Sequence, residues 1–255
     1  MELNRQQPAW PKTNRSCRPS GTLRTYLNDF RVWERRSEGL AGEGEHLYLQ
    51  IQKTNVTTTI VQNGLARYFK VPVMDVSYAG LKDRRAVATQ WFSVRLPQKK
   101  TDLIDGIQIE GCSIVDSGWH YRKLRRGNLD GNDFEIIVRN VEGPVEEGIT
   151  QLVQGGFPNY FGPQRFGNKG NNIYGATEWI QSRRPKVSRL KRSVFISTLR
   201  SVLFNDVLGE RVRKRSWNTP TVGDELMEGL PTGPLWGRGR PLSNDLVFEL
   251  ENQVA

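Results

Sequence analysis

The chain has 255 residues, a formal net charge of +10, two cysteines and two histidines. This length suffices for one large domain or two modest ones. The positive charge favours a polyanionic partner, such as nucleic acid or an anionic membrane surface. Cys17 and Cys112 lie far apart in the sequence, which fits a reducing compartment and argues against a disulfide framework. We expect one exposed and one buried thiol.

Motifs for common cofactors are absent from the sequence. There is no Cys-x-x-Cys, no His-Glu-x-x-His, and no glycine-rich phosphate or dinucleotide motif at a strand-to-helix junction. Residues 1–20 contain no apolar signal-peptide stretch, and no later segment is long and apolar enough to cross a bilayer. We therefore expect a soluble cytoplasmic protein without metal or cofactor, whose chemistry depends on carboxylates, cations and aromatics.

The N-terminal third of the chain contains two predicted strands and a helix. Residues 1–20 are polar and contain proline, so we expect a poorly ordered lead-in. Residues 23–34 are typical of a strand entered through an Asn-Asp turn, in which Phe30 is either a core residue or a ligand contact. Residues 46–52 alternate with period two, as a half-buried strand does, and residues 54–69 have helical spacing.

Residues 76–90 contain the most distinctive charge pattern. A β-rich run breaks at Gly80, and Lys82, Asp83, Arg84 and Arg85 follow in consecutive positions before strand-like residues resume. The pattern predicts a charged loop between two strands. A carboxylate next to three cations should stay ionised at neutral pH, so Asp83 is a candidate nucleophile or base for an anionic ligand. The alternative is a solvated turn with a surface ion pair.

Three further β-like segments follow, residues 91–96, 107–115 and 134–138. Residues 120–127 carry four cations, a histidine and a tyrosine, which suits either a phosphate-tracking surface with a stacking group or a solvated charge run. A short helix is predicted to begin at Pro144 and to end at Gly155, where we place the domain change.

The last hundred residues are predicted to be mainly helical. Arg165 lies in an aromatic loop, residues 157–167, and is a candidate RNA contact. A helix at residues 171–181 precedes residues 183–192, where six cations indicate either an RNA backbone contact or a soluble surface. Ser193 is the predicted cap of the next helix. Its predicted core stripe is Phe195, Leu199, Val202, Leu203 and Val207.

Three of these stretches resemble the signatures of one family. Residues 80–90 (Gly-Leu-Lys-Asp-Arg-Arg-Ala-Val-Ala-Thr-Gln) and residues 159–167 (Asn-Tyr-Phe-Gly-Pro-Gln-Arg-Phe-Gly) are similar to two signatures of the tRNA pseudouridine synthase D (TruD) family. Residues 191–205 resemble the family's long helix in character and order. Because three motifs occur in the family's order over most of the chain, the sequence is identified as a member.

The resemblance implies an α+β fold in two parts. A pseudouridine synthase-type catalytic domain with a mixed β-sheet should carry an inserted, mainly helical α+β TRUD domain. We expect the catalytic part at residues 21–154 and an incomplete TRUD domain at residues 155–255. The match is thin beyond Arg215, and we find no counterpart of the family's closing segment.

The resemblance also implies a reaction and a set of site residues. A uridine of tRNA, in the family at position 13, would leave its stack and be isomerised to pseudouridine without a cofactor. Asp83 would act as a nucleophile on the ribose C1′ or as a base on C2′. The expected substrate-binding residues are Phe30, Lys82, Arg84, Asn132, Phe134 and Arg165.

Two alternatives stay open at this point. The chain could be a non-catalytic RNA-binding remnant, or one half of a split enzyme that a separate chain completes. In each case tRNA is the expected partner.

Overall fold

The computed structural model describes residues 8–13, 19–96, 104, 106–233, 235–237 and 243–254. The chain forms two compact units, and we describe each by itself. The sheet unit is Ser20–Glu142, and the helical unit is Met1–Pro19 with Gly143–Ala255. The units therefore divide at residue 142, whereas the sequence predicted a domain change at residue 154. The assignment of catalytic and TRUD domains to these units stays a prediction.

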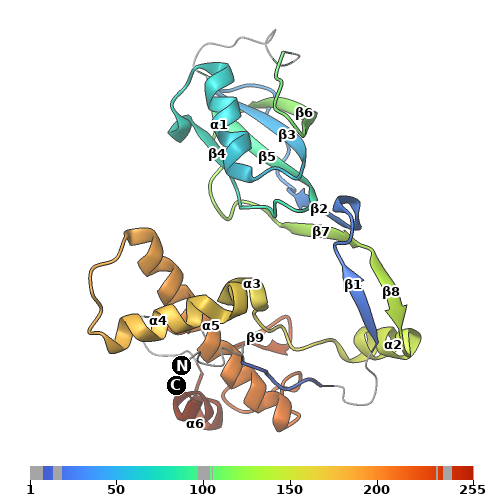
Figure 1. Cartoon of the computed structure of the whole chain (residues 1–255), viewed down its shortest axis with the longest axis vertical. Coiled ribbons are helices and arrows are strands. Elements are labelled where there is room, and N and C mark those ends of the chain that lie inside the picture. Colours follow the sequence, from blue (N-terminus) through green and yellow to red (C-terminus); the bar gives the residue numbers. More distant parts are fainter. Residues whose placement is uncertain are drawn as a thin grey trace. The chain divides into compact units, whose positions relative to one another are not determined.

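The sheet unit is built on a six-stranded sheet with the order β6-β3-β5-β2-β7, in which β4 also pairs with β5 (Figure 1). The strands are β2 (Phe30–Arg35), β3 (His46–Thr54), β4 (Val76–Tyr78), β5 (Val87–Arg95), β6 (Cys112–His120) and β7 (Gly131–Ile136). Strand β5 runs parallel to β2 and antiparallel to β3 and β4. The sheet is thus mixed, and together with the helices it confirms the α+β prediction.

The main hydrophobic core lies between this sheet and helix α1 (Thr58–Phe69). Leu47, Leu49 and Ile51 of β3 share one face, as the period-two alternation predicted, and are at most 1% exposed. Val61 and Leu65 of α1 pack against them and are fully buried. The helix begins four residues later than predicted, because β3 continues to Thr54 and the Thr57 hydroxyl caps α1 by accepting from the Ile60 backbone N–H at 3.3 Å.

The predicted strand at residues 23–34 is interrupted. It consists of β1 (Ser20–Leu23), the short 3-10 helix η1 (Leu27–Asp29) and the start of β2. The buried Asp29 carboxylate closes the turn: it accepts from the Tyr26 backbone N–H at 2.9 Å and from Arg139 Nη2 at 2.8 Å. The Arg139 hydrogen bonds hold the pKa of Asp29 below its usual value. Arg139 lies on β8 (Val138–Glu142), which forms a two-stranded ribbon with β1.

The helical unit contains most of the remaining elements. They are α2 (Val145–Gly155), α3 (Pro163–Phe166), η4 (Asn168–Gly170), α4 (Asn171–Gln181), α5 (Arg189–Arg213), β9 (Leu226–Met227), β10 (Leu230–Pro231) and α6 (Asp245–Val254); the sheet unit also has η2 (Val73–Asp75). Helix α4 matches the predicted range. The predicted cap at Ser193 is wrong: Ser188 caps α5 by accepting from the Lys191 backbone N–H at 3.2 Å, so α5 starts inside the basic stretch.

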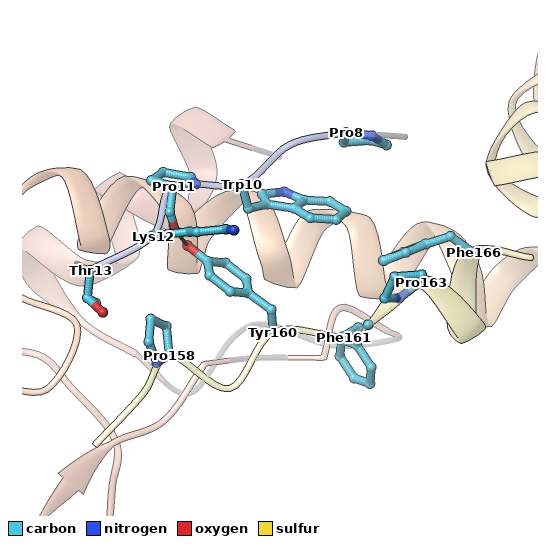
Figure 2. Close-up of a pocket in the computed structure, with 11 residues that line it drawn as sticks. Pro8, Trp10, Pro11, Lys12, Thr13, Pro158, Tyr160, Phe161, Pro163 and Phe166 are labelled. Atoms are coloured by element: carbon cyan, nitrogen blue, oxygen red, sulfur yellow. Dashed lines mark hydrogen bonds between the residues drawn. The ribbon is translucent and has the colours of Figure 1, made fainter. Parts of the chain in front are cut away.

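Residues 8–13 pack within the helical unit (Figure 2). Trp10 Nε1 donates to Asp206 Oδ1 of α5 at 2.7 Å, and the Tyr160 hydroxyl donates to the Pro11 carbonyl at 3.0 Å. The ring centroids of Trp10 and the fully buried Phe166 are 5.1 Å apart. This part of the predicted lead-in therefore has specific contacts in the structure.

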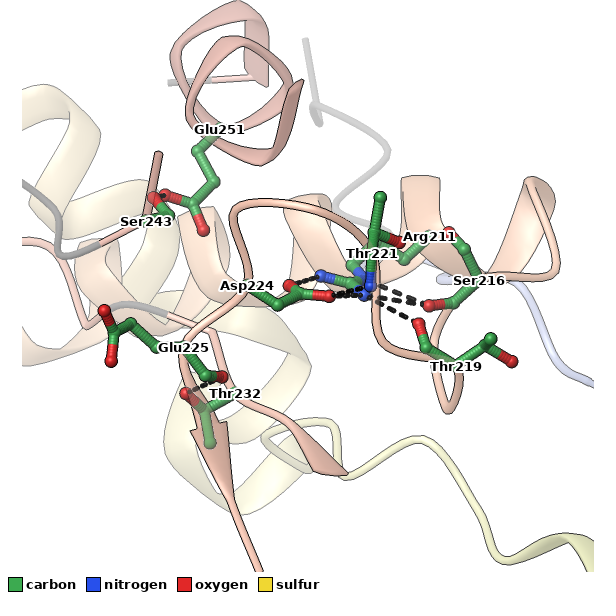
Figure 3. A network of polar contacts seen from close by, with 9 residues as sticks. All are labelled: Arg211, Ser216, Thr219, Thr221, Asp224, Glu225, Thr232, Ser243 and Glu251. Carbon is green, nitrogen blue, oxygen red and sulfur yellow. Dashed lines mark hydrogen bonds and ion pairs between the residues drawn. The ribbon is translucent and has the colours of Figure 1, made fainter. Parts of the chain in front are cut away.

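A buried ion pair closes the segment that follows α5 (Figure 3). The Arg211 guanidinium binds the Asp224 carboxylate, with Nη2 to Oδ2 at 2.8 Å, and also donates to the Ser216 carbonyl at 2.9 Å. Burial raises the pKa of Asp224, but the hydrogen bonds from Arg211 and from the Thr221 backbone outweigh burial, so that the net pKa is lowered. The network fixes the backbone of residues 216–224.

Membrane-spanning helices and metal clusters are both absent from the described residues. Among them, no helix is long and apolar enough to span a membrane, and no group of three or more His, Cys, Asp or Glu side chains could hold a metal ion. Cys17 lies outside the described residues. Cys112 is a half-buried free cysteine, and burial raises the pKa of its thiol to about 11.

Candidate active site

The predicted charged loop is confirmed: residues 79–86 connect β4 to β5. Ala79 and Ala86, at its two ends, are 3% and 0% exposed. The backbone is held from neighbouring elements, because Gln90 Nε2 donates to the Gly80 carbonyl at 3.2 Å and the Lys82 backbone N–H donates to the Thr58 hydroxyl at 3.1 Å. A loop anchored at this many points can hold a side chain in one orientation.

Lys53 lies under this loop and is fully buried. Its ammonium donates to the carbonyls of Asp83 at 2.7 Å and Val56 at 2.8 Å, with the Lys82 carbonyl at 3.5 Å. Burial lowers the pKa of Lys53 to about 8, so the ammonium form predominates at neutral pH. Because an ammonium has three N–H donors, it matches three carbonyl acceptors. Lys53 therefore fixes the backbone position of Asp83.

Lys82 is anchored by a second buried contact. Its Nζ lies 2.6 Å from Glu34 Oε2, and the two side chains are 7% and 1% exposed. Glu34 also accepts from the Trp91 backbone N–H at 3.3 Å. Since the charge of Lys82 is balanced inside the protein, this geometry favours a loop-anchoring role. The expected contact of Lys82 with phosphate stays a prediction.

The Asp83 side chain is partly exposed and contacts Arg24. Arg24 Nη2 lies 2.6 Å from Asp83 Oδ2, and the two side chains are 33% and 26% exposed. The same guanidinium lies over the Phe30 ring, 3.9 Å from its centroid. A cation at this distance stabilises the ionised carboxylate, which is the form that a nucleophile or base requires.

The predicted aromatic residues lie next to this pair. The ring centroids of Phe30 and Phe134 are 5.9 Å apart in an edge-to-face arrangement. Phe134 is paired with Val32, and Asn132 with Glu34, so strand alternation places Phe30, Phe134 and Asn132 on one face of β2 and β7. Phe134 is 57% exposed, which leaves part of the ring available for stacking. The structure thus brings Asp83, Phe30, Phe134 and Asn132 to one region.

The remaining two predicted residues have different surroundings. Arg84 is exposed, and its Nε donates to the Asn55 carbonyl at 3.3 Å. Arg165 belongs to the helical unit, where Nη1 donates to the Ser197 hydroxyl at 3.1 Å and the guanidinium lies 5.5 Å from the Phe161 ring centroid. The roles of both residues in RNA binding stay predictions.

Sequence reasoning missed Arg24, Glu34 and Lys53. Arg24 and Glu34 lie 59 and 48 positions from their partners, and neither residue carries a local signal of such a contact. Lys53 did carry one, because it continues the alternating face of Leu47, Leu49 and Ile51. A lysine on a predicted core face is rare and indicates a buried partner.

The arrangement suits chemistry on an aromatic, anionic ligand. A partly exposed carboxylate is paired with a guanidinium that lies over Phe30, and an exposed ring and an amide lie on the same face of β2 and β7 as Phe30. These are the groups that bind a nucleotide taken out of its stack: a ring for the base face, an amide for its edge, and a carboxylate for the reaction.

The fold is that of a solved structure. The crystal structure assigned to tRNA pseudouridine synthase D from Methanosarcina mazei has a TM-score of 0.68 and 21% identity, and the match covers 100% of this chain and 82% of that one. The protein therefore has the same α+β fold as that structure.

Sequence comparison narrows this class to a family. The family model for tRNA pseudouridine synthase D (TruD) matches residues 13–187. Proteins named tRNA pseudouridine synthase D from Methylococcus capsulatus and Cellvibrio japonicus are each 40% identical, and the one from Colwellia psychrerythraea is 38% identical. Each match covers 92% of this chain and 71% to 74% of the relative. The chain belongs to the tRNA pseudouridine synthase D family, whose enzymes are isomerases.

Proposed function

We propose that this chain converts a uridine of tRNA, in the family at position 13, to pseudouridine, and that Asp83 carries the chemistry. The observation that supports this most is the Asp83 carboxylate, 26% exposed on a buried scaffold and 2.6 Å from Arg24. Phe30 and Phe134 lie beside it, where a base would bind. In this proposal tRNA is the partner, and the protein acts in the cytoplasm.

The reaction balances within one nucleotide. The bond from ribose C1′ to N1 of the base breaks, and a bond from C1′ to C5 forms. The C5 proton is lost and N1 gains a proton, so no oxidant, energy source or cofactor is consumed. Asp83 would either attack C1′, forming an ester bond that breaks when C5 bonds to C1′, or remove the C2′ proton and return it afterwards; both routes stay open.

The neighbouring residues have separate roles in this proposal. The uridine must leave its stack, at a cost of about a few kcal/mol, and stacking on Phe134 beside Phe30 offsets part of that cost. Asn132 reads an edge of the base. Arg24 orients the Asp83 carboxylate, while Lys53 and the Glu34–Lys82 pair hold its backbone. Arg84 and Arg165 bind RNA phosphates.

Asp83→Asn is the direct test. The substitution is nearly isosteric, so product should be lost while tRNA affinity stays within a few fold of wild type. Pseudouridine is measured by liquid chromatography and mass spectrometry of the nucleosides after incubation with a tRNA transcript. Asp133→Asn is the matched control, because Asp133 lies on β7 and is 58% exposed; its turnover should be unchanged. Turnover of Asp83→Asn near that of wild type would remove Asp83 from its role.

The alternatives predict other results for the wild-type chain. A non-catalytic RNA-binding protein would bind tRNA and form no pseudouridine. Half of a split enzyme would form product only after a separate chain is supplied.

A further inference from the structure

A groove is formed in part by the second half of the Asp83 loop. Its volume is about 740 Å³, and its walls come from the turn before β2, the end of β3 and the second half of the loop. The lining residues that matter here are Thr25, Tyr26, Asn28, Asn55, Arg84 and Arg85. Binding sites for small molecules have volumes of about 300–1,000 Å³, so one nucleotide can fit.

The lining of this groove is cationic. It includes the guanidiniums of Arg84 and Arg85, and none of the described residues that line it has a carboxylate. Both arginines are exposed, and within the described part of the chain no hydrogen bond or ion pair engages the Arg85 side chain. Guanidiniums bind phosphate through paired N–H donors. The charge of the groove therefore matches an RNA phosphate.

Tyr26 offers an oriented aromatic surface in the same groove. Its side chain is 62% exposed, and the Arg139 guanidinium lies over its ring, 4.8 Å from the centroid. Arg139 is itself fixed by its bidentate contact with the buried Asp29, and Asp29 also accepts from the Tyr26 backbone N–H. An exposed ring whose orientation is fixed in this way can stack on a nucleobase at a small entropic cost.

We infer that this groove is a second nucleotide subsite, which holds the nucleotide adjacent to the target uridine. The base stacks on Tyr26, and Arg84 and Arg85 bind a phosphate. The groove and the candidate active site share the same loop and the same turn, because Arg84 directly follows Asp83 and Tyr26 lies two residues after Arg24, whose side chain contacts Asp83. This inference rests on the proposed function, since it requires an RNA whose uridine lies at Asp83.

A double-mutant cycle tests the stacking contact. The RNAs are an unmodified tRNA transcript and two transcripts with an abasic residue on the 5′ or the 3′ side of the target uridine. Base stacking on an aromatic side chain contributes about 1–3 kcal/mol, or roughly 5-fold to 150-fold in affinity. One of the two abasic changes should weaken binding by that factor for wild type and Tyr26→Phe, and by less than about twofold for Tyr26→Ala. Equal penalties for wild type and Tyr26→Ala on both RNAs would overturn the inference.

The phosphate contact has its own test. Arg85→Gln should reduce the magnitude of the slope of log affinity against log salt by roughly 0.7–0.9, which is the contribution of one phosphate contact. Arg95→Gln is the control, because Arg95 lies at the far end of β5, is 50% exposed and pairs with Glu45; its slope should match wild type. An unchanged slope for Arg85→Gln would contradict the phosphate contact. Competition by polyglutamate as strong as that by RNA would show a general site for acidic peptides instead.

These measurements separate the inference from the proposed function. Affinities are read without turnover, so the cycle gives a result even if the chain forms no pseudouridine. If wild type makes pseudouridine but the cycle shows no coupling, only the second subsite is excluded.

Discussion

The two cationic stretches of the chain are similar in composition, but only the first contains charges that are paired with residues from other elements. In residues 82–85, the side chain of Lys82 is 7% exposed and paired with Glu34, and Asp83 is paired with Arg24. Residues 183–192 contain six cations, and all of these side chains are exposed. No ion pair joins them to another residue in the part of the chain that the structure describes. Lys82 and Asp83 of the first stretch have charged partners, whereas Arg84, Arg85 and all six cations of the second stretch are exposed and can contact a polyanion.

This difference shows why charge count is a weak guide to a site. Both stretches satisfy the same sequence criterion of dense positive charge. The first stretch differs because residues from other elements contact it. These residues are Glu34 of β2, Lys53 of β3 and Arg24 of the turn before η1. The predictions below change these partners, a buried carboxylate elsewhere in the sheet unit, or the exposed stretch, and each has a control variant at a residue without that role.

The largest expected effect on stability is that of Glu34→Gln. The change leaves the Lys82 ammonium buried without its counter-charge, and breaking a buried pair in this way costs about 3–5 kcal/mol. Glu210→Gln is the matched control, because the Glu210–Arg213 pair has exposed fractions of 29% and 58% and should contribute less than about 1 kcal/mol. Urea unfolding of the two variants measures the difference. Equal destabilisation of both variants would show that the Lys82 pair behaves as a surface contact.

The second effect is on turnover. Lys53→Met keeps an unbranched side chain that is one atom shorter, but it leaves the Asp83 and Val56 carbonyls without their donor, so the loop should shift. A displacement of about 1 Å at a catalytic group can reduce the rate by about 10²-fold. Single-turnover rates at saturating tRNA should fall by that order while tRNA affinity changes little. Leu49→Ala, on the same face of β3, controls for reduced core stability and should keep its rate; a normal rate in Lys53→Met would exclude the positioning role.

Much of the fold was predictable, because periodicity is local. The alternating strand at β3, the helix at α4 and the loop between β4 and β5 follow from neighbouring residues. The errors occurred where a side chain decides the backbone path. Asp29 interrupts the strand predicted at residues 23–34, and Ser188 caps α5 five residues before the predicted Ser193.

The candidate site was only partly predictable. The resemblance pointed to Asp83, Phe30, Asn132 and Phe134, and the structure places them in one region. The supporting residues Arg24 and Lys53 contact the loop across 59 and 30 positions of sequence, and such contacts depend on strand register. A single sequence gives no register, so the scaffold of the site had to come from the structure.

The third prediction concerns acid stability of the sheet unit. Because Arg139 lowers the pKa of Asp29 from 3.8, the stability that this carboxylate contributes is present above pH 3.8 and is lost as the pH falls through the lower pKa of the folded state. Asp29→Asn should lower stability at pH 7 and show a smaller further loss than wild type as the pH falls below 3.8. The exposed Asp116 serves as the control, and Asp116→Asn should keep the wild-type acid profile. Parallel profiles for wild type and Asp29→Asn would contradict the pKa shift.

The smallest effect per residue is expected in the exposed stretch. The variant replaces four cations by glutamine: Arg183, Arg184, Lys191 and Arg192. The slope of log tRNA affinity against log salt should become smaller in magnitude by roughly 0.7–0.9 for each phosphate that these side chains bind in the wild type. Folding should not suffer, because Lys191 and Arg192 lie in the first turn of α5, where positive charge is unfavourable to the helix dipole.

The control for this slope is a pair of cations that already have partners. Arg35 and Arg95 are exposed and lie 3.7 Å and 3.3 Å from Asp133 and Glu45. Arg35→Gln with Arg95→Gln should leave the slope near that of wild type, because a paired cation displaces fewer counterions from RNA than a free one. If the fourfold variant also keeps the wild-type slope, residues 183–192 are a solvated surface. Residues 82–85 would then be a loop held by partners from other elements, residues 183–192 would contact only solvent, and the RNA contacts would be made by other residues.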